Sequence, residues 1–479
     1  MDIFSKMFGK EKKRSSPTRE RNARSIRANA LDSAASSNES AAYWSFASNA
    51  IADEIANAQT RKKLRARCRY EYLNDGYAQN AARNLAIAVV GCGPRLQIHA
   101  EREVAESIEK EFQKWAKEVR LAEKLDLAIR ALVFDGEAFI RFVKNDRISG
   151  NVDIELIDAG RVTSETVGAS IDENILDGIR YDDYGRVVYY TVSKTTVNPL
   201  YSSFPTEFER VPAEDMLHLF IPDLPGQHRG LPLLQSSLQT LGALRRYNAA
   251  VIEAAETAAA HAVLIHTQHL PDGSEPDEAE AMDEVIVPRR GGMFLPKGWI
   301  ASQMKPEQPT AQHSDFISVA LTGIGAGVGQ PRNIISNDSS NYNYSSGRLD
   351  HQTFFRYVET IQQRLTYLLD AMLDNVLLTL GMESVSERED VATEWYFAEL
   401  AHVDPKKEAD TAVQLLNAGL LTRKEYFAKF GQDWEQQAEQ LEKERERFPV
   451  GVNEVTKDNE AIQDDPDKEP DETGEEGGG

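Results

Sequence analysis

Two long helical stretches place the strongest constraint on the fold of this chain. Residues 231–262 have the pattern of one alanine-rich helix with Gly242 as its weak point, and residues 346–380 have the pattern of a second, amphipathic helix. At 1.5 Å per residue, about 30 helical residues make a rod of about 45 Å, which is too long for a small domain. An alanine-rich rod permits close approach but fills no bulky core, so we expect it to pack against other copies of itself.

Between the two long helices the sequence predicts a small mixed insert over 263–311, a shorter helix over 312–329 and a polar loop over 330–346. The stretch IISNDSSNYNYSSGRLD (334–350) contains five serines and two tyrosines, and its polar side chains would suit a catalytic loop, a recognition loop, or a loop that slides past a ligand without gripping it. The candidate residues of this loop are Asn337, Asp338, Ser339, Ser340, Asn341, Tyr342, Asn343, Tyr344, Ser345 and Ser346.

The remaining pattern predicts an α+β fold. Helical periodicity runs through 40–90 and again through 101–118 and 120–133. Between 137 and 221 the apolar period changes to two, in strand-like segments such as EAFIRFV and VDIELID that are divided by turn residues. Because no segment of helical length separates these strands, we expect an antiparallel sheet.

The distribution of charge excludes a whole-protein basic field that would grip nucleic acid. The formal net charge is −23, and the pI is about 4.9. The first 30 residues hold nine Lys or Arg against three acids, whereas 452–479 hold eleven acids against two lysines. Such blocks predict a disordered basic arm over 1–39 and a disordered acidic tail over 448–479, with docking tails as the alternative.

Cysteine content and hydropathy indicate the compartment. Only Cys68 and Cys92 occur, which suits a reducing environment. No apolar segment follows the first basic residues, so we expect no secretion. The longest apolar run, 316–329, has 14 residues and falls short of the roughly 20 that span a bilayer. We therefore expect a soluble intracellular product without a membrane partner.

Signals of catalysis are weak. The motifs GxxxxGK[ST], HExxH and GxSxG are absent from the sequence. The alternate glycines of 323–329 end a helix-like segment, which favours a flexible terminus or hinge over a nucleotide loop. Glu253 and Glu256 read as a solvated helix face, and the three histidines within 261–269 lack metal-ligand geometry. We therefore predict no catalytic residue, no metal and no cofactor.

Several stretches, in order over roughly residues 40–430, resemble the lambda-type portal proteins of tailed bacteriophages. They include FDGEAFIRF (134–142), IELIDAGRV (154–162) and VPAEDMLHLFIPDLPGQHRGLPLL (211–234). The most specific are a GQ-x-RG-x-P turn and an NYSS-x-R stretch. These motifs contribute Gly226, Gln227, Arg229, Gly230 and Pro232, which follow Pro225, and Asn343 to Ser346 with Arg348.

The resemblance implies a ring, usually of twelve copies, at one capsid vertex, through which double-stranded DNA enters and leaves. It implies an α/β wing, long stem helices, a small mixed α/β clip and a helical crown. The implied partners are further copies, the major capsid protein, the terminase large subunit and a head–tail connector. The implied parts are a wing (40–230), a stem helix (231–262), a clip (263–311), a second stem helix (312–329), a tunnel loop (330–346), a long wing helix (347–384) and a crown (385–447).

On this interpretation an acidic protein with an Asn/Ser/Tyr loop lets DNA pass, because each phosphate neutralised by Lys or Arg adds affinity. The turn at 225–232 would direct the chain from wing to stem, and Arg348 would brace the base of the loop. The motor must be another protein, since this chain has no P-loop. The expected location is the virion, after assembly in the host cytoplasm. The alternatives are a phage-encoded, metal-dependent nucleic-acid-processing enzyme and a non-viral oligomeric scaffold.

Overall fold

In the computed structural model of this chain, the described residues are 47–164, 174–194, 207–260, 264–267, 299–302, 313–340, 342–382, 391–397, 405–430 and 434–447. The chain divides into two units, residues 1–55 and 56–479. The described part of the first unit contains the short helix α3 (Ala52–Ile55), and all other described elements belong to the second. The two expected arms, 1–39 and 448–479, lie outside the described residues.

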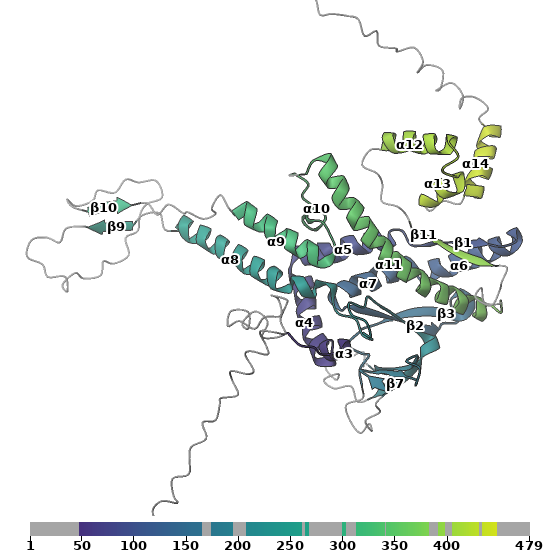
Figure 1. Cartoon of the computed structure of the whole chain (residues 1–479), viewed down its shortest axis with the longest axis horizontal. Helices are drawn as coiled ribbons and strands as arrows, with labels where there is room; N and C mark the ends of the chain where they lie inside the picture. Colours follow the sequence, from purple (N-terminus) through teal and green to yellow (C-terminus); the bar gives the residue numbers. More distant parts are fainter. Residues whose placement is uncertain are drawn as a thin grey trace, which may run out of the picture. The chain divides into compact units, whose positions relative to one another are not determined.

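A group of long helices forms the larger of two cores in the second unit (Figure 1). α5 packs against both α7 and α11, and its buried positions are alanines, Leu85 and two valines, which allow close helix contacts. The helical pattern of 40–90 is broken at Asp75, whose carboxylate accepts hydrogen bonds from the amides of Tyr77 and Ala78 and caps α5. The helices concerned are α4 (Ala58–Asn74), α5 (Gly76–Val90), α6 (Arg102–Glu118), α7 (Leu121–Phe134) and α11 (Tyr344–Thr379).

The strands of 137–220 are all antiparallel, as predicted, but they form two sheets. Strand β2 lies at the centre of the sheet β3-β2-β8 and separates two cores, because its side chains alternate in direction. Ile140 and Phe142 enter the helical core, whereas Phe139 enters a second core shared with the sheet β4-β5-β6-β7. The strands are β2 (Glu137–Lys144), β3 (Val152–Ile157), β4 (Ile175–Leu176), β5 (Ile179–Tyr181), β6 (Val187–Ser193), β7 (Phe208–Pro212) and β8 (Met216–Phe220), with short 3-10 turns η2 (Ser149–Asn151) and η4 (Ala213–Asp215).

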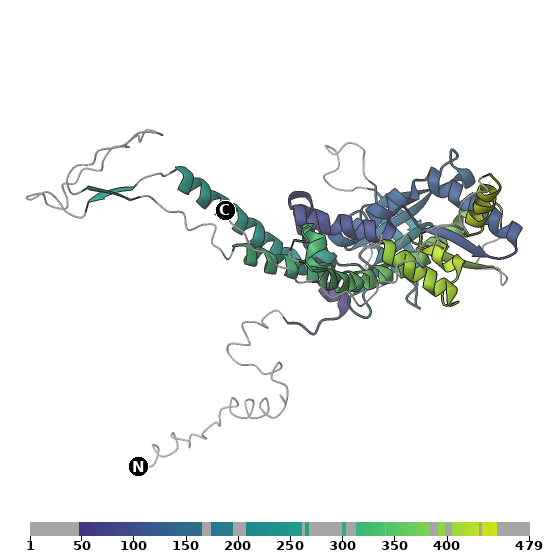
Figure 2. The same ribbon diagram turned by 90° about the horizontal axis from the view of Figure 1, so that it is seen from above.

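Two antiparallel helices lie side by side and extend away from these cores (Figures 1 and 2). The first begins later than the expected residue 231, since the 3-10 turn η5 (Leu233–Ser237) precedes α8 (Leu238–Ala260). The second, α9 (His313–Val328), matches the expected helix. Of the insert between them, the structure describes β9 (Leu264–Thr267) and β10 (Trp299–Ser302), which pair antiparallel. None of the described helices is long and apolar enough to cross a membrane.

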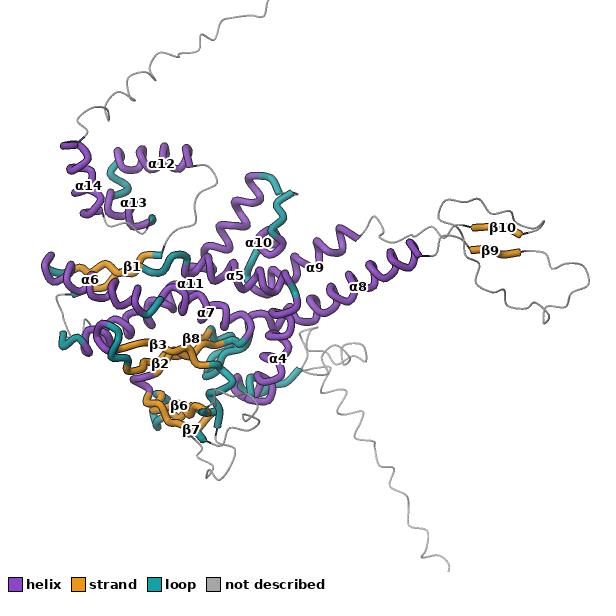
Figure 3. Tube along the Cα trace, turned by 180° about the vertical axis from the view of Figure 1, so that it is seen from behind, coloured by secondary structure: helices purple, strands orange, loops and turns teal. Residues whose placement is uncertain are grey.

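One segment differs from the expected helical crown over 385–447. Residues Ala392–Tyr396 form strand β11, which pairs antiparallel with β1 (Arg95–His99) across almost 300 residues of sequence (Figure 1; β1 is also labelled in Figure 3). Trp395 of β11 packs edge to face against Phe112 of α6, with ring centroids 5.2 Å apart. Strand β11 has only five residues, which is too few to show a clear period of two, so the sequence alone does not identify it as a strand. The helices that follow are α12 (Pro405–Asn417), α13 (Arg423–Lys429) and α14 (Trp434–Arg447).

Candidate functional site

The turn at 225–232, which leads into η5 and α8, is built around a buried arginine. Arg229 is 0% exposed, and so is Glu137, the first residue of β2. The guanidinium donates two hydrogen bonds to that carboxylate, from Nε to Oε2 at 2.8 Å and from Nη2 to Oε1 at 2.7 Å. It also donates to the carbonyl of Asp177 and lies 5.2 Å from the centre of the Phe139 ring. Arg229 therefore attaches this turn to strand β2 of the sheet.

The carboxylate of Glu137 accepts hydrogen bonds from several further elements. Its oxygens also accept from Nη2 of Arg65 at 3.3 Å, from the amide of Gly230 at 3.2 Å and from the ring of His218 at 3.1 Å. Burial opposes ionisation, but the charge of Arg229 and the hydrogen bonds from His218 and Arg229 hold the pKa of Glu137 below its ordinary value. Burial lowers the pKa of His218, so the ring is neutral at neutral pH and donates from Nε2.

A basic face of α4 extends this cluster. Arg61, Arg65 and Arg69 recur every four residues and therefore lie on one face of the helix. Arg69 binds Asp135 in two hydrogen bonds of 2.6 and 2.7 Å and reaches Asp158 at 2.8 Å, and Arg61 pairs with Asp177. With Arg229 and Glu137, four guanidinium groups face four carboxylates, so the formal charges balance. The cluster joins α4, the end of α7, two sheets and the turn.

Two glycines let the backbones of the turn and of β2 approach each other. A Cβ on Gly230 would lie 2.0 Å from the carbonyl oxygen of Gly136, and a Cβ on Gly136 would lie 2.2 Å from the carbonyl carbon of Leu231. Both distances are far below any real contact. These glycines are thus required for the position of the chain just before η5 and α8.

The other predicted residues of this turn divide into buried and exposed ones. Gln227 is 7% exposed, and its amide spans the turn, accepting from the amide of Asp223 at 2.9 Å and donating to the carbonyl of Arg229 at 2.8 Å. Pro232 is buried immediately before η5. Pro225 and Gly226 are exposed, and Gly226 has a φ of +78° that favours glycine.

The polar loop is shorter than the expected 330–346, because residues Arg332–Ser336 form the helix α10 and α11 begins at Tyr344. Two asparagines of α5 donate hydrogen bonds to the end of α10, directly before this loop. Asn80 Nδ2 donates to the carbonyls of Ile334 and Ile335 at 2.9 and 2.7 Å, and Asn84 Nδ2 donates to that of Ile334 at 2.7 Å. The last carbonyls of α10, which have no partner inside the helix, are satisfied in this way.

Within the loop, Asn337 adopts a left-handed φ of 53° and ends α10. Asp338 accepts from the amide and hydroxyl of Ser340 at 2.9 and 2.6 Å, which closes a tight turn. Asn337, Asp338, Ser339 and Ser340 are all exposed, Tyr342 is half-buried, and Ser345 is exposed in the first turn of α11. Asn341 and the side chain of Tyr344 lie outside the described residues.

The NYSS motif is a helix start. Asn343 is the N-cap of α11, and its side chain accepts from the amide of Ser346 at 2.8 Å. The hydroxyl of Ser346 in turn accepts from the amide of Asn343 at 3.3 Å. This reciprocal capping box explains why these residue types stand at this spacing.

The side chain of Arg348 is exposed, and its expected role as a brace of the loop stays a prediction. Arg332 contacts the loop. Its guanidinium lies 5.3 Å from the centre of the Tyr342 ring and donates to Ser318 Oγ of α9 at 2.8 Å. Arg332, which precedes the loop, therefore joins Tyr342 to helix α9.

Three of the four alternate glycines of 323–329 are closely packed, which disagrees with a flexible hinge, whereas a Cβ on Gly323 would meet nothing within 4 Å. Helix α9 ends at Val328, among these glycines, as expected for a helix terminus. A Cβ on Gly325 would lie 2.4 Å from the carbonyl oxygen of Gln330, and one on Gly327 would lie 2.2 Å from Ser237 Oγ of η5. A Cβ on Gly329 would lie 2.7 Å from the Tyr357 ring of α11. These glycines hold α9 against its neighbours.

The remaining candidates add no chemistry to the described part of the chain. Glu253 and Glu256 are exposed, as expected for a solvated helix face. His261, His269 and the side chain of His266 lie outside the described residues. Among the residues that the structure describes, no group of three or more His, Cys, Asp or Glu is placed to hold a metal ion.

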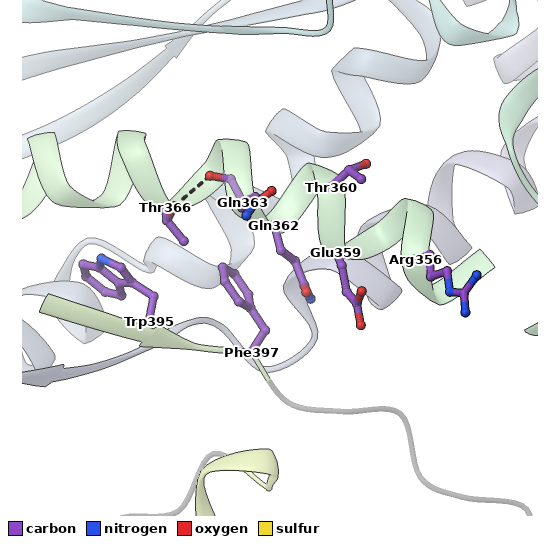
Figure 4. Close-up of a pocket in the computed structure, with 8 residues that line it drawn as sticks. All are labelled: Arg356, Glu359, Thr360, Gln362, Gln363, Thr366, Trp395 and Phe397. Atoms are coloured by element: carbon purple, nitrogen blue, oxygen red, sulfur yellow. Dashed lines mark hydrogen bonds between the residues drawn. The ribbon is translucent and has the colours of Figure 1, made fainter. Parts of the chain in front are cut away.

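A cavity of about 350 Å³ lies apart from both the turn and the loop, between α11 and the segment of β11 (Figure 4). The rings of Trp395 and Phe397 form one side, and polar side chains of α11 such as Gln363 form the other. None of the residues predicted from the sequence lines it.

Sequence reasoning missed the partners of the predicted residues: Asn80, Asn84, Glu137 and Arg332. Asn80 and Asn84 carry a usable signal, since they stand four apart in an alanine-rich helix and so share one face. Glu137 gives only a weak signal, as a single acidic residue at the start of an apolar strand.

This combination of antiparallel sheets, a two-helix extension and a capped long helix agrees with the results of comparison with known proteins. The family profile described as "Phage portal protein, lambda family" matches residues 37–362. The chain therefore belongs to the lambda family of phage portal proteins, as its resemblance indicated.

Individual relatives are distant. The probable portal protein of Halomonas phage phiHAP-1 is 22% identical over 401 residues, which cover 77% of each chain. A chain from the neck of an empty GTA particle with C6 symmetry has a TM-score of 0.50 and 16% identity, covering 76% of this chain and 92% of that one. A chain from the neck of a native GTA particle with C12 symmetry has a TM-score of 0.49 and 15% identity, covering 78% and 94%. The first of these neck chains supports an α+β portal fold.

Proposed function

We propose that this protein forms a ring, most simply of twelve copies, that serves as the DNA channel at one vertex of a phage capsid. The observation that carries this proposal is the exposed surface of helices α8 and α9, which we assign as the stem. A pair of helices that extends from the cores without a third layer has to bury its apolar side chains against another molecule. In a closed ring, each stem is covered by the stems of its two neighbours.

The exposure of the stem supports this arrangement. No residue of α8 between Asn248 and Glu256 is buried, and the same holds for α9 from His313 to Ala320. Ile252 is 59% exposed, Phe316 is 47% exposed and Val319 is 73% exposed. A ring built through this surface would remove these side chains from water, at a gain of about 25 cal/mol per Å² of apolar area.

The loop between α10 and α11 is proposed to face the DNA. Its exposed side chains at 337–340 are amide, hydroxyl and a single carboxylate, so they offer hydrogen bonds but no positive charge. Contacts of this kind carry little sequence information. They also release no counterions and thus add no salt-dependent affinity. The loop would keep DNA centred without retarding it.

The remaining assignments follow from family membership. The stem helices are α8 and α9, the insert between them is the clip, and residues 56–230 contribute the wing. The clip would bind the terminase during packaging and a head–tail connector later, and the wing would contact the major capsid protein. The protein would be a structural, non-catalytic part of the virion that assembles in the host cytoplasm.

The native mass of the purified chain tests the ring. A dominant species near twelve times 53.5 kDa is expected. A closed ring with one more subunit would still agree with a portal assembled without its capsid. A monomer or dimer at every protein and salt concentration would contradict the channel.

The loop is tested separately by replacing residues 338–341 with a glycine-serine linker, which spares the capping box at Asn343. Rings are expected to form normally, while DNA packaging or retention is impaired. If the replacement prevents ring assembly, the loop is a structural element and its proposed contact with DNA is wrong.

A further inference from the structure

Arg332 lies against the polar loop and contacts both the loop and helix α9. It opens α10, is half-buried, and donates from Nη1 to Ser318 Oγ at 2.8 Å. The ring of Tyr342, at the other end of the loop, lies over the guanidinium at 5.3 Å. Arg332 therefore connects the stem helix α9 to the far side of the loop.

The carboxylate of Asp338 in the loop also interacts electrostatically with Arg332. Hydrogen bonds from the hydroxyl and amide of Ser340, and then the positive charge of Arg332, lower the pKa of Asp338. Asp338 is thus ionised at neutral pH and provides a counter-charge near Arg332, although these two side chains, both described in the structure, form no direct ion pair. An aromatic face and a hydroxyl, which Arg332 does contact, are two kinds of group that a guanidinium prefers.

We propose that the loop folds over Arg332 in order to shield it, so that the loop presents no free guanidinium to the phosphates of passing DNA. This inference rests on the proposed function, because it assumes that the loop faces DNA. Tyr342 is the shielding residue and Asp338 the counter-charge, and neither acts by binding DNA itself.

The shield matters because of what a free arginine would do in a channel. Arginine binds phosphate through two parallel hydrogen bonds and is never neutral at physiological pH. Each phosphate contact raises affinity and steepens its dependence on salt by about 0.9 on a log–log scale. A ring multiplies this effect by the number of subunits that touch DNA at one time.

The first experiment measures the binding of a short DNA duplex to the assembled ring over a series of salt concentrations. Tyr342→Ala is expected to bind several-fold more tightly at low salt, with a slope steeper by about 0.9 for each additional phosphate that the ring neutralises. Tyr342→Phe retains the aromatic face and is expected to behave as the wild type does. In the double variant Tyr342→Ala/Arg332→Gln, both affinity and slope are expected to return to wild-type values.

Two outcomes of this experiment overturn the shield. If Tyr342→Ala matches the wild type in affinity and slope, then Arg332 is not released by loss of the ring of Tyr342. If Arg332→Gln alone weakens DNA binding relative to the wild type, then Arg332 already contacts DNA. In either case the oligomeric ring and its packaging function could still hold, because native mass and the loop replacement test them independently.

A second experiment requires neither DNA nor an oligomeric ring. Phenylglyoxal modifies accessible arginines, and mass spectrometry compares Arg332 with Arg348, which is exposed sixteen residues later. We expect Arg332 to be modified more slowly than Arg348 in the wild type, and at a rate close to that of Arg348 in Tyr342→Ala. Equal rates at the two arginines in the wild-type protein would contradict the shield.

Discussion

Arg229 and Glu137 form an ion pair in which both side chains are 0% exposed and joined by two hydrogen bonds of 2.7 and 2.8 Å. Arg229 belongs to the turn that leads into η5 and α8, and Glu137 begins β2, the central strand of a sheet. The pair therefore ties the start of this helical segment to the sheet. Removing one partner of a buried pair leaves a charge without compensation, which is the costly case for buried ion pairs.

We expect Arg229→Met to lower the free energy of unfolding by about 3–5 kcal/mol, because it removes the closest countercharge of the buried Glu137. Chemical denaturation at a fixed protein concentration measures this loss. Arg186→Ala is the matched control: this arginine pairs with Asp182 on the surface, where the expected cost is under about 1 kcal/mol. Equal losses in the two variants would show that the buried pair has no special weight.

Two glycines of the same helix make a matched test of packing. A Cβ at Gly325 would meet the backbone oxygen of Gln330 at 2.4 Å, whereas a Cβ at Gly323 would meet nothing within 4 Å. Gly325→Ala is expected to lower the melting temperature. Gly323→Ala is expected to raise it slightly, since alanine is favoured over glycine in a helix by about 1 kcal/mol. A melting temperature that rises in both variants would restore the hinge interpretation of these glycines.

The buried cluster that contains Glu137 and His218 predicts that the stability of the fold depends on pH. An unfolded chain protonates His218 near pH 6.5, but the folded protein, where burial lowers the pKa of this ring, does so only at lower pH. The unfolded state thus binds more protons just below pH 6.5, so stability falls as the pH is lowered through this window. Glu137, whose pKa is also lowered, adds a loss with the same sign below about pH 4.5.

His218→Gln separates the first of these effects, because glutamine can still donate a hydrogen bond to Glu137 but does not titrate. Melting temperatures between pH 7.5 and 5.5 are expected to fall more steeply in the wild type than in this variant. Parallel curves would mean that His218 does not contribute to the acid sensitivity of the fold.

Because the exposed loop side chains at 337–340 carry no positive charge, we expect that a lysine placed there slows the passage of DNA through the ring. Ser339 is exposed, and Ser339→Lys places one ammonium per subunit at the loop. Rings of unchanged mass are expected, with tighter and more salt-dependent duplex binding and slower packaging. Ser339→Glu controls for size and for charge of the opposite sign. Packaging by Ser339→Lys at the wild-type rate would argue that the loop does not approach DNA.

The sequence by itself determined the elements with a long, regular pattern. Apolar residues three or four apart predicted α9 and α11, and the change to a period of two predicted β2, β3, β6 and β8 as antiparallel strands, because these signals depend on local backbone geometry. Ordered motifs also indicated the portal family, which the family profile confirms.

The tertiary structure decided which distant residues meet. Arg229 was visible as part of a turn, but Glu137 stands 92 positions earlier, and local spacing does not record such a contact. Likewise β11 pairs with β1, and Arg332 contacts Tyr342 of the loop from a position ten residues earlier. A buried charge or a short strand is stable only with its partner, so its role depends on the folded arrangement of the whole chain.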